Sequence, residues 1–265
     1  MEWLCKKQPM LPVTSVLFDF DGTISTLRCG WEAVMESLMC ELLGGSNEPK
    51  KDIRDTIRQY IDESTGVQTI FQMKWLAEQL SLQDPAADYN PWDLKAEYNS
   101  RLMNAVMGKR GRILSGEDLP EDYMIKGSRE VLEMLAEQGV TLYIASGTDD
   151  ADVKQEADVL GLAALFSEIK GAPEGREDCS KEAVVRSLIG QNGEAGTLAV
   201  VGDGKVEIAI GRENGARTLG LASDEQRGFG VNPVKRERLV KAGADAITGD
   251  FQDMAALKQF FFGDS

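Results

Sequence analysis

The sequence predicts an α/β fold: a Rossmann-like three-layer core with a mostly parallel sheet, into which an α-helical domain is inserted. Three observations lead to this prediction. Beyond residue 126, short apolar segments alternate with segments of helical period, as in strands joined by right-handed crossovers. An apolar segment near the amino terminus is followed only by helical patterns up to that point. With 42% hydrophobic and 28% charged residues, the composition is that of a globular protein, not of a disordered or membrane-embedded one.

The first strand is expected over residues 14–20, and the segment after it has the apolar spacing of helices. The helices expected there lie around 31–43, 53–61 and 68–80, and a further one begins at 92. After the first strand, no convincing strand occurs before residue 139. We therefore expect a core domain, formed by residues 1–26 and 126–265, and a helical domain formed by residues 27–125.

Strands and helices alternate in the remainder of the chain. The strands are expected at 140–145, 165–169, 198–201, 218–221 and 246–248. The helices are expected at 128–138, 149–160, 180–189, 207–214, 234–241 and 254–261. Each helix is long enough to connect two parallel strands, so these strands should lie in one sheet.

The charge and the residue types restrict the function. A net charge of −15 repels polyanions, so we expect no nucleic-acid partner and no membrane partner. The absence of histidine excludes Ser-His-Asp and Cys-His catalysis and leaves proton transfer to carboxylates, lysine or tyrosine. The four cysteines form no CxxC pattern and are interpreted as reduced thiols, and no segment has the length of a membrane span. We expect a cytoplasmic protein that is a monomer or a homodimer.

The first predicted strand ends in two carboxylates, Asp19 and Asp21, which are followed by Gly22 and Thr23. Side chains two residues apart on an extended segment point the same way, so both carboxylates should project from the carboxyl end of the strand, where α/β sheets bind ligands. Clustered carboxylates repel each other unless a cation lies between them. The pattern therefore indicates a Mg²⁺ site in which one carboxylate is also a nucleophile; an Asp-Gly turn without a chemical role is the alternative.

Two later strands also end in polar residues. Ser146 and Gly147 come just before a predicted helix, where a hydroxyl and backbone N–H groups suit the binding of phosphate oxygens. Asp203 and Glu207 follow another apolar segment and supply two further carboxylates. Taken singly, these residues have ordinary explanations as a helix cap or a turn aspartate. Their occurrence in order at the ends of successive strands favours a shared site.

One lysine is expected to complete that site. Lys181 lies at the start of a predicted helix, and Lys170 competes with it for the same role. A solvated surface charge is the alternative for either residue.

These segments together resemble the haloacid dehalogenase-like hydrolase superfamily along the whole chain. Its four motifs are matched in order by residues 18–23 (DxDGT), by 145–147 (a strand ending in Ser), by Lys181, and by 202–203 with Glu207. The last match departs from the usual pattern, because the second acidic residue is more often aspartate. The helical insertion looks like the cap domain of phosphoglycolate phosphatase-like and β-phosphoglucomutase-like members.

The resemblance implies a role for each matched residue. Asp19 would attack phosphorus and form an aspartyl-phosphate, and Asp21 would protonate the leaving group and then deprotonate water. Mg²⁺ is the implied cofactor. Its implied ligands are Asp19, the Asp21 backbone carbonyl, Asp203 and Glu207, the last either directly or through water. The phosphate oxygens would be bound by Ser146, Lys181 and Gly147, with Gly22 and Thr23 beside them.

Arg28 lies at the entry to the helical insertion and is our candidate for a second contact to an anionic substrate. An exposed arginine at the start of a helix is the alternative for this residue.

Together these residues predict a Mg²⁺-dependent phosphatase that acts on a small phosphorylated metabolite. A phosphomutase of the β-phosphoglucomutase type would use the same residues and differ in whether the closed cap admits water. A phosphonate-cleaving hydrolase would need a cap lysine that forms a Schiff base, for which Lys50, Lys51 and Lys74 have no distinctive context. A non-catalytic binding protein would be expected to have lost the motif carboxylates, and they are intact.

Overall fold

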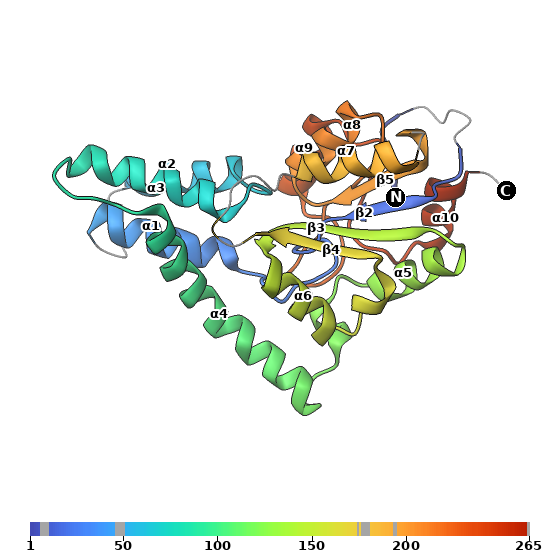
Figure 1. Ribbon diagram of the computed structural model, residues 1–265, viewed down its shortest axis with the longest axis horizontal. Helices are drawn as coiled ribbons and strands as arrows, with labels where there is room; N and C mark the ends of the chain where they lie inside the picture. Colours follow the sequence, from blue (N-terminus) through green and yellow to red (C-terminus); the bar gives the residue numbers. More distant parts are fainter. Residues whose placement is uncertain (6–10, 46–50, 174, 176–180, 193–194, 264–265) are drawn as a thin grey trace. The chain divides into compact units, whose positions relative to one another are not determined.

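The structure is a computed structural model and describes residues 1–5, 11–45, 51–173, 175, 181–192 and 195–263 (Figure 1). The chain separates into two compact units, one formed by Met1–Cys29 with Arg110–Ser265 and the other by Gly30–Lys109. The sequence-based division assigned residues 27–125 to the helical domain, whereas the contacts group residues 27–29 and 110–125 with the larger unit.

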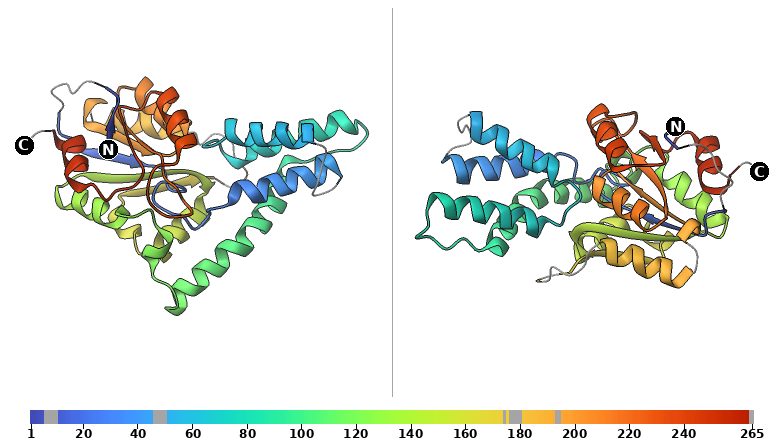
Figure 2. Two further views of the ribbon diagram at one scale, coloured as in Figure 1. Left: turned by 180° about the vertical axis from the view of Figure 1, so that it is seen from behind. Right: turned by 90° about the horizontal axis from the view of Figure 1, so that it is seen from above.

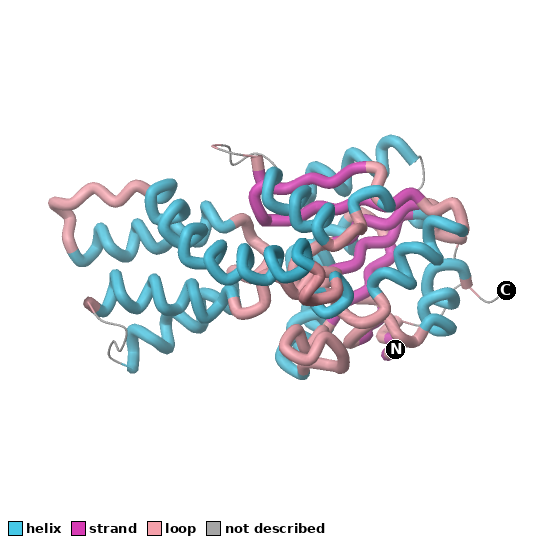
Figure 3. Tube along the Cα trace, turned by 90° about the horizontal axis from the view of Figure 1, so that it is seen from below, coloured by secondary structure: helices cyan, strands magenta, loops and turns pink. Residues whose placement is uncertain are grey.

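The larger unit is built around one sheet. Among the described residues, seven strands pair in the order β1-β7-β6-β5-β2-β3-β4, drawn in magenta in Figure 3. The strands are β1 (Glu2–Trp3), β2 (Ser15–Phe18), β3 (Thr141–Asp149), β4 (Glu168–Ala172), β5 (Leu198–Gly202), β6 (Arg217–Leu221) and β7 (Ala246–Thr248). All pairings are parallel except that of β1 with β7. The predicted α/β fold with a mostly parallel sheet is confirmed.

Helices cover both faces of this sheet (Figures 1 and 2). One face is covered by α5 (Ser128–Glu137), α6 (Asp150–Val159) and α10 (Met254–Phe262). The other is covered by α7 (Lys181–Asn192), α8 (Lys205–Glu213) and α9 (Pro233–Ala242). Neighbouring residues of β2 point to opposite faces, so Phe18 packs in the first layer and Leu17 in the second. Burial on both faces explains why the central strands are apolar without alternation.

The observed elements differ from the predicted ones in three places. β1 was not predicted, because two residues are too few to show a period. The strand expected at 165–169 lies at Glu168–Ala172, since Ala163–Leu165 forms a 3₁₀ turn that packs against the core. β3 continues to Asp149 instead of ending at residue 145, and its register against β4 shifts between Ala145 and Asp149.

The smaller unit is helical and has its own hydrophobic core. Its described helices are α1 (Trp31–Gly44), α2 (Lys51–Glu63), α3 (Thr69–Gln83) and α4 (Pro91–Ser115), the last of which continues into the larger unit. The rings of Tyr60 and Trp75 stack at 3.9 Å between α2 and α3. Apolar side chains of all four helices form one buried cluster. This unit therefore carries its own packing energy.

Two expectations from composition can be compared with the structure. None of the described helices combines the length and the apolar character needed to cross a bilayer. Cys5, Cys29 and Cys40 are free thiols, and Cys179 falls outside the described residues.

Candidate active site

The sheet order reverses at β2. From β2 the chain continues to β3 and β4 on one side, whereas β5, β6 and β7 lie on the other. Open α/β sheets bind ligands beyond the carboxyl ends of their strands at such a reversal. The polar residues predicted from the sequence follow the carboxyl ends of β2 and β5 or lie late in β3, so the topology brings them together.

Lys181, the first residue of α7, connects two carboxylates. Its Nζ donates to Oδ1 of Asp19 at 2.7 Å and to Oε2 of Glu207 at 3.1 Å. The competing lysine, Lys170, lies on β4, and its Nζ is 3.0 Å from a carboxylate oxygen of Glu168 at the surface. Of the two candidates, only Lys181 contacts the motif carboxylates in the described part of the chain.

Asp19, Asp203 and Glu207 form a buried carboxylate cluster. One oxygen of each lies within 4.8 Å of the others. The hydroxyl of Thr23 donates to Oδ2 of Asp19 at 3.5 Å, and the Gly204 N–H donates to Oε1 of Glu207 at 2.6 Å. Carboxylate oxygens are the ligands that hard divalent cations such as Mg²⁺ prefer.

The charges in this cluster favour a bound cation. The pKa of Asp19 lies well above its usual range, first because burial disfavours the carboxylate and further because Glu207 and Asp203 are negative. Lys181 acts in the opposite direction on the pKa of Asp19, but it does not outweigh burial. An additional positive charge among these oxygens would relieve the repulsion.

A second buried lysine lies on the far side of Asp203. Nζ of Lys235, from α9, donates to Oδ2 of Asp203 at 2.6 Å, to Oε1 of Glu225 at 2.5 Å and to Oγ of Ser223 at 3.2 Å. Burial lowers the pKa of Lys235, but the two neighbouring carboxylates outweigh this effect and raise the pKa above its ordinary value, so the side chain is an ammonium.

Carboxylates therefore surround both lysines of this region: Asp19 and Glu207 contact Lys181, and Asp203 and Glu225 contact Lys235. The cluster of Asp19, Asp203 and Glu207 fits a divalent cation in the chemistry of its donor atoms.

Asp21 lies outside the carboxylate cluster. Its Oδ2 accepts hydrogen bonds from Oγ1 of Thr148 at 2.8 Å and from Oγ of Ser146 at 3.3 Å. Its buried Oδ1 accepts no hydrogen bond from the described residues, and Nε of Arg28 lies 3.8 Å from it. The Asp21 carboxylate is thus not one of the three whose oxygens lie within 4.8 Å of one another.

Arg28 is not the exposed arginine that the alternative interpretation expected. The side chain is buried, and Nη2 donates to Oε1 of Glu156 at 2.7 Å and to Oδ2 of Asp152 at 3.2 Å. Nε donates to both carboxylate oxygens of Glu156 at 3.1 and 3.2 Å. Burial raises the pKa of Glu156 to about 7 in spite of the arginine. The guanidinium thus pairs with two carboxylates of α6.

The extension of β3 changes the surroundings of Ser146 and Gly147. α6 begins at Asp150, so the N–H of Gly147 lies in a strand and not at a helix terminus as expected. Ser146 and Thr148 are two residues apart on this strand and both reach Asp21. The N–H of Thr148 also donates to Oγ of Ser146 at 3.0 Å, which holds that hydroxyl in place.

Gly22 is in the left-handed region, with φ of 73°. A Cβ added there would lie 2.4 Å from Oδ2 of Asp203 and 3.0 Å from Oε1 of Glu225. The motif glycine therefore allows both a tight turn and the close approach of these carboxylates.

Sequence reasoning missed several residues that contact the predicted site residues directly or through Lys235. They are Thr148, Glu156, Ser223, Glu225 and Lys235. Thr148 had a detectable signal, since it follows Ser146 at the spacing that shares one face of a strand. The others lie in helices or loops whose approach to the site depends on the packing of α6 and α9, and their local sequence contains no corresponding signal.

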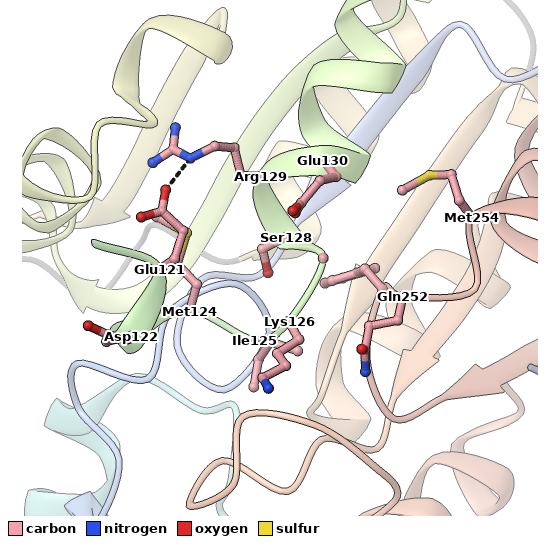
Figure 4. Close-up of a pocket in the computed structure, with 12 residues that line it drawn as sticks. Glu121, Asp122, Met124, Ile125, Lys126, Ser128, Arg129, Glu130, Gln252 and Met254 are labelled. Carbon is pink, nitrogen blue, oxygen red and sulfur yellow. Dashed lines mark hydrogen bonds and ion pairs between the residues drawn. The ribbon is translucent and has the colours of Figure 1, made fainter. Parts of the chain in front are cut away.

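A cavity of about 500 Å³ lies elsewhere on the larger unit, between residues 121–130 and 251–254 (Figure 4). Two of its charged lining residues pair with each other, because Nε of Arg129 donates to Oε1 of Glu121 at 2.6 Å. None of the carboxylate-cluster residues lines it. We assign this cavity no part in the chemistry considered below.

A family model described as haloacid dehalogenase-like hydrolase matches residues 13–215 of the chain. A search of curated proteins found no match to the chain.

Several solved structures have the same fold. A predicted phosphoglycolate phosphatase from Haemophilus somnus is 18% identical with a TM-score of 0.62, and 93% of this chain aligns with 98% of that one. A β-phosphoglucomutase from Clostridium difficile is 14% identical with a TM-score of 0.65, covering 94% of this chain and 97% of that one. A predicted phosphatase from Clostridium acetobutylicum is 17% identical with a TM-score of 0.62, covering 93% and 98%. At these identities the likeness is one of fold.

Proposed function

Because the chain belongs to the haloacid dehalogenase-like hydrolase family, we propose that it is a Mg²⁺-dependent phosphatase that acts on a small phosphorylated metabolite. The observation that supports this most strongly is the contact of Lys181 with Asp19 inside the buried carboxylate cluster. A carboxylate nucleophile beside a fixed ammonium suits phosphoryl transfer, in which positioning and charge stabilisation provide most of the catalysis.

Asp19 supplies the attacking oxygen. As its bond to phosphorus forms, the bond from phosphorus to the leaving oxygen breaks, which leaves an aspartyl-phosphate. Lys181, at 2.7 Å from Oδ1, keeps the carboxylate in one orientation and contributes positive charge where phosphoryl oxygens gather.

Asp21 moves the protons. Its carboxyl group gives a proton to the leaving alkoxide and later takes one from the water that hydrolyses the aspartyl-phosphate. The hydroxyls of Thr148 and Ser146 hold Oδ2, so the side chain keeps one orientation through both steps.

Asp19, Asp203 and the backbone carbonyl of Asp21 would hold Mg²⁺, with Glu207 contributing directly or through water. When bound, Mg²⁺ supplies positive charge that screens these carboxylates from the substrate phosphate and stabilises the negative charge that develops on it.

The unit Gly30–Lys109 is proposed to act as a cap that recognises the part of the substrate beyond the phosphate. A phosphonate-cleaving reaction, which is less favoured, would need a cap lysine to form a Schiff base. Of the lysines considered for this role, Lys50 lies outside the described residues. A phosphomutase is the second candidate, since a β-phosphoglucomutase is among the similar structures.

A screen of phosphorylated metabolites, with and without Mg²⁺, tests the proposal. We expect Mg²⁺-dependent phosphate release that Asp19→Asn abolishes, whereas Asp158→Asn, on the exposed side of α6, keeps the activity. Release of no phosphate from any substrate, or full activity of Asp19→Asn, would contradict it. Product analysis with a hexose 1-phosphate separates hydrolysis from transfer within the sugar.

A further inference from the structure

The start of α9 holds Lys235 in a fixed position. The side chain of Asn232 caps the helix by accepting the N–H groups of Val234 and Lys235 at 3.0 and 3.2 Å. Pro233 occupies the first turn, where its φ angle suits a helix and no N–H is needed. The backbone of Lys235 is therefore set by local sequence before any contact of its side chain is made.

Three oxygens surround the ammonium of Lys235. They belong to Asp203, Glu225 and Ser223, at 2.6, 2.5 and 3.2 Å from Nζ. The lysine side chain is only 10% exposed, and those of Asp203 and Glu225 are 11% and 12% exposed. Two buried carboxylates and a hydroxyl directed at one point are an environment that a metal cation could also occupy.

This group of residues also contacts the motif loop. Oγ of Ser223 donates to the carbonyl oxygen of Gly22 at 2.5 Å while it accepts from Lys235. Oδ2 of Asp203 and Oε1 of Glu225 occupy the space that a Cβ at Gly22 would need. Lys235 thus connects α9 to Asp203 and, through Ser223, to the residue that follows Asp21.

We propose that Lys235 is a permanent cation beside the divalent-ion site: it orients Asp203 and limits the carboxylate group to one divalent ion. Asp203 then bridges two cations, one oxygen facing Lys235 and the other free for the ion. The inference rests on the proposed function in one respect, because it requires that the cluster of Asp19, Asp203 and Glu207 binds a divalent ion.

The contacts of the ammonium explain the limit of one ion. With Lys235 in place, a cation already lies among the oxygens of Asp203, Glu225 and Ser223. Without the ammonium, these three oxygens lose that positive charge. If the space is also opened, a second divalent ion and its water ligands can take the place of the ammonium.

Two substitutions separate the effect of the lysine's charge from the effect of its side-chain volume. Lys235→Met removes the charge but fills the volume, whereas Lys235→Ala removes both. The probe is Mn²⁺, and its stoichiometry is measured by isothermal titration calorimetry and by electron paramagnetic resonance, in which two nearby Mn²⁺ ions broaden each other's signal. We expect one Mn²⁺ in the wild-type protein, one in Lys235→Met and two in Lys235→Ala. Both variants should melt at a lower temperature than the wild type in metal-free buffer.

The outcomes distinguish this inference from the proposed function. If the wild-type protein binds no Mn²⁺, both the metal site and the role of Lys235 are wrong. If the wild type binds one ion and Lys235→Ala also binds one, the role of Lys235 alone is wrong.

A second variant covers the case in which Lys235→Ala does not fold. Glu225→Gln keeps the lysine, and Glu225 contacts Lys235 and is not in the carboxylate cluster. Because this substitution removes one negative charge beside the site, we expect the Mn²⁺ dissociation constant to rise, but by less than about 10-fold, or about 1.4 kcal/mol. A weakening of more than about 10-fold would mean that Glu225 is itself a ligand of the ion, which overturns the inference.

Discussion

Replacing Gly22 with alanine should lower the free energy of unfolding by more than the unfavourable backbone angle of Gly22 alone predicts. Gly22 has φ of 73°, a conformation that costs an L-residue about 1–2 kcal/mol. The new Cβ would also lie 2.4 Å from Oδ2 of Asp203. Overpacking of this kind adds about 1–3 kcal/mol, so the total loss of stability should be about 2–5 kcal/mol.

Rotation of the Asp203 carboxylate could relieve the overlap, but only by breaking its 2.6 Å contact with Lys235 and moving an oxygen that faces the cation site. We therefore expect Gly22→Ala to weaken Mn²⁺ binding by about 10-fold or more, which is about 1.4 kcal/mol.

Gly139 provides a matched control. Its φ is 75°, and an added Cβ would meet no heavy atom within 4 Å. Gly139→Ala should therefore lose only the conformational part, about 1–2 kcal/mol, and bind Mn²⁺ as the wild type does. The assays are urea unfolding in metal-free buffer, followed by tryptophan fluorescence, and calorimetric titration with Mn²⁺. Equal destabilisation of the two variants, with unchanged Mn²⁺ binding in Gly22→Ala, would refute the reasoning.

Three further predictions follow from contacts in the site. Lys181→Met should reduce phosphate release by about 1,000-fold or more, because the phosphoryl oxygens lose a fixed positive charge, whereas Lys170→Met should stay near wild type; equal losses in a phosphate-release assay would contradict this. Thr148→Val should lower kcat by about 10-fold with little change in KM, since it removes the 2.8 Å hydrogen bond to Asp21; an unchanged kcat in steady-state kinetics would be evidence against that role. The folded-state pKa of Glu156, about 7, exceeds its ordinary 4.5, so the stabilisation belongs to the protonated form: it is present below pH 4.5 and lost as pH rises through 7. Relative to Glu156→Gln, the wild-type free energy of unfolding should fall by about 3 kcal/mol between pH 4.5 and 8, as measured by urea unfolding at each pH, and a pH-independent difference would disprove the assignment.

The sequence predicted those parts of the site that depend on the local order of residues along the chain. Asp19 directly follows an apolar strand, and Asp203 follows another, so the strand ends and the parallel order of the sheet were enough to bring them together. Lys181 was one of two candidates, because the family's third motif places its lysine at variable spacing and Lys170 lies eleven residues earlier in the chain. The distance to Asp19 separates them.

Other contacts were decided by the tertiary structure. Arg28 pairs with Glu156, 128 positions away, because α6 packs beside the loop that follows β2. Lys235 reaches Asp203 across 32 positions through the capped start of α9. Nothing in the neighbourhood of either residue in the sequence indicates its partner, since a helix face shows only whether it is apolar or polar.

The stretch from Val16 to Thr23 shows which properties of the site are local and which depend on the tertiary structure. Sequence alone determined that an apolar strand ends in two carboxylates and a glycine turn, since strand period and turn residues are local properties. Only the tertiary structure decided that these carboxylates have different surroundings, with Asp19 beside Lys181 and Asp21 beside Thr148. The physical reason is that β3 pairs with β2 within the sheet whereas α7 packs on one of its faces, and long-range packing sets both positions.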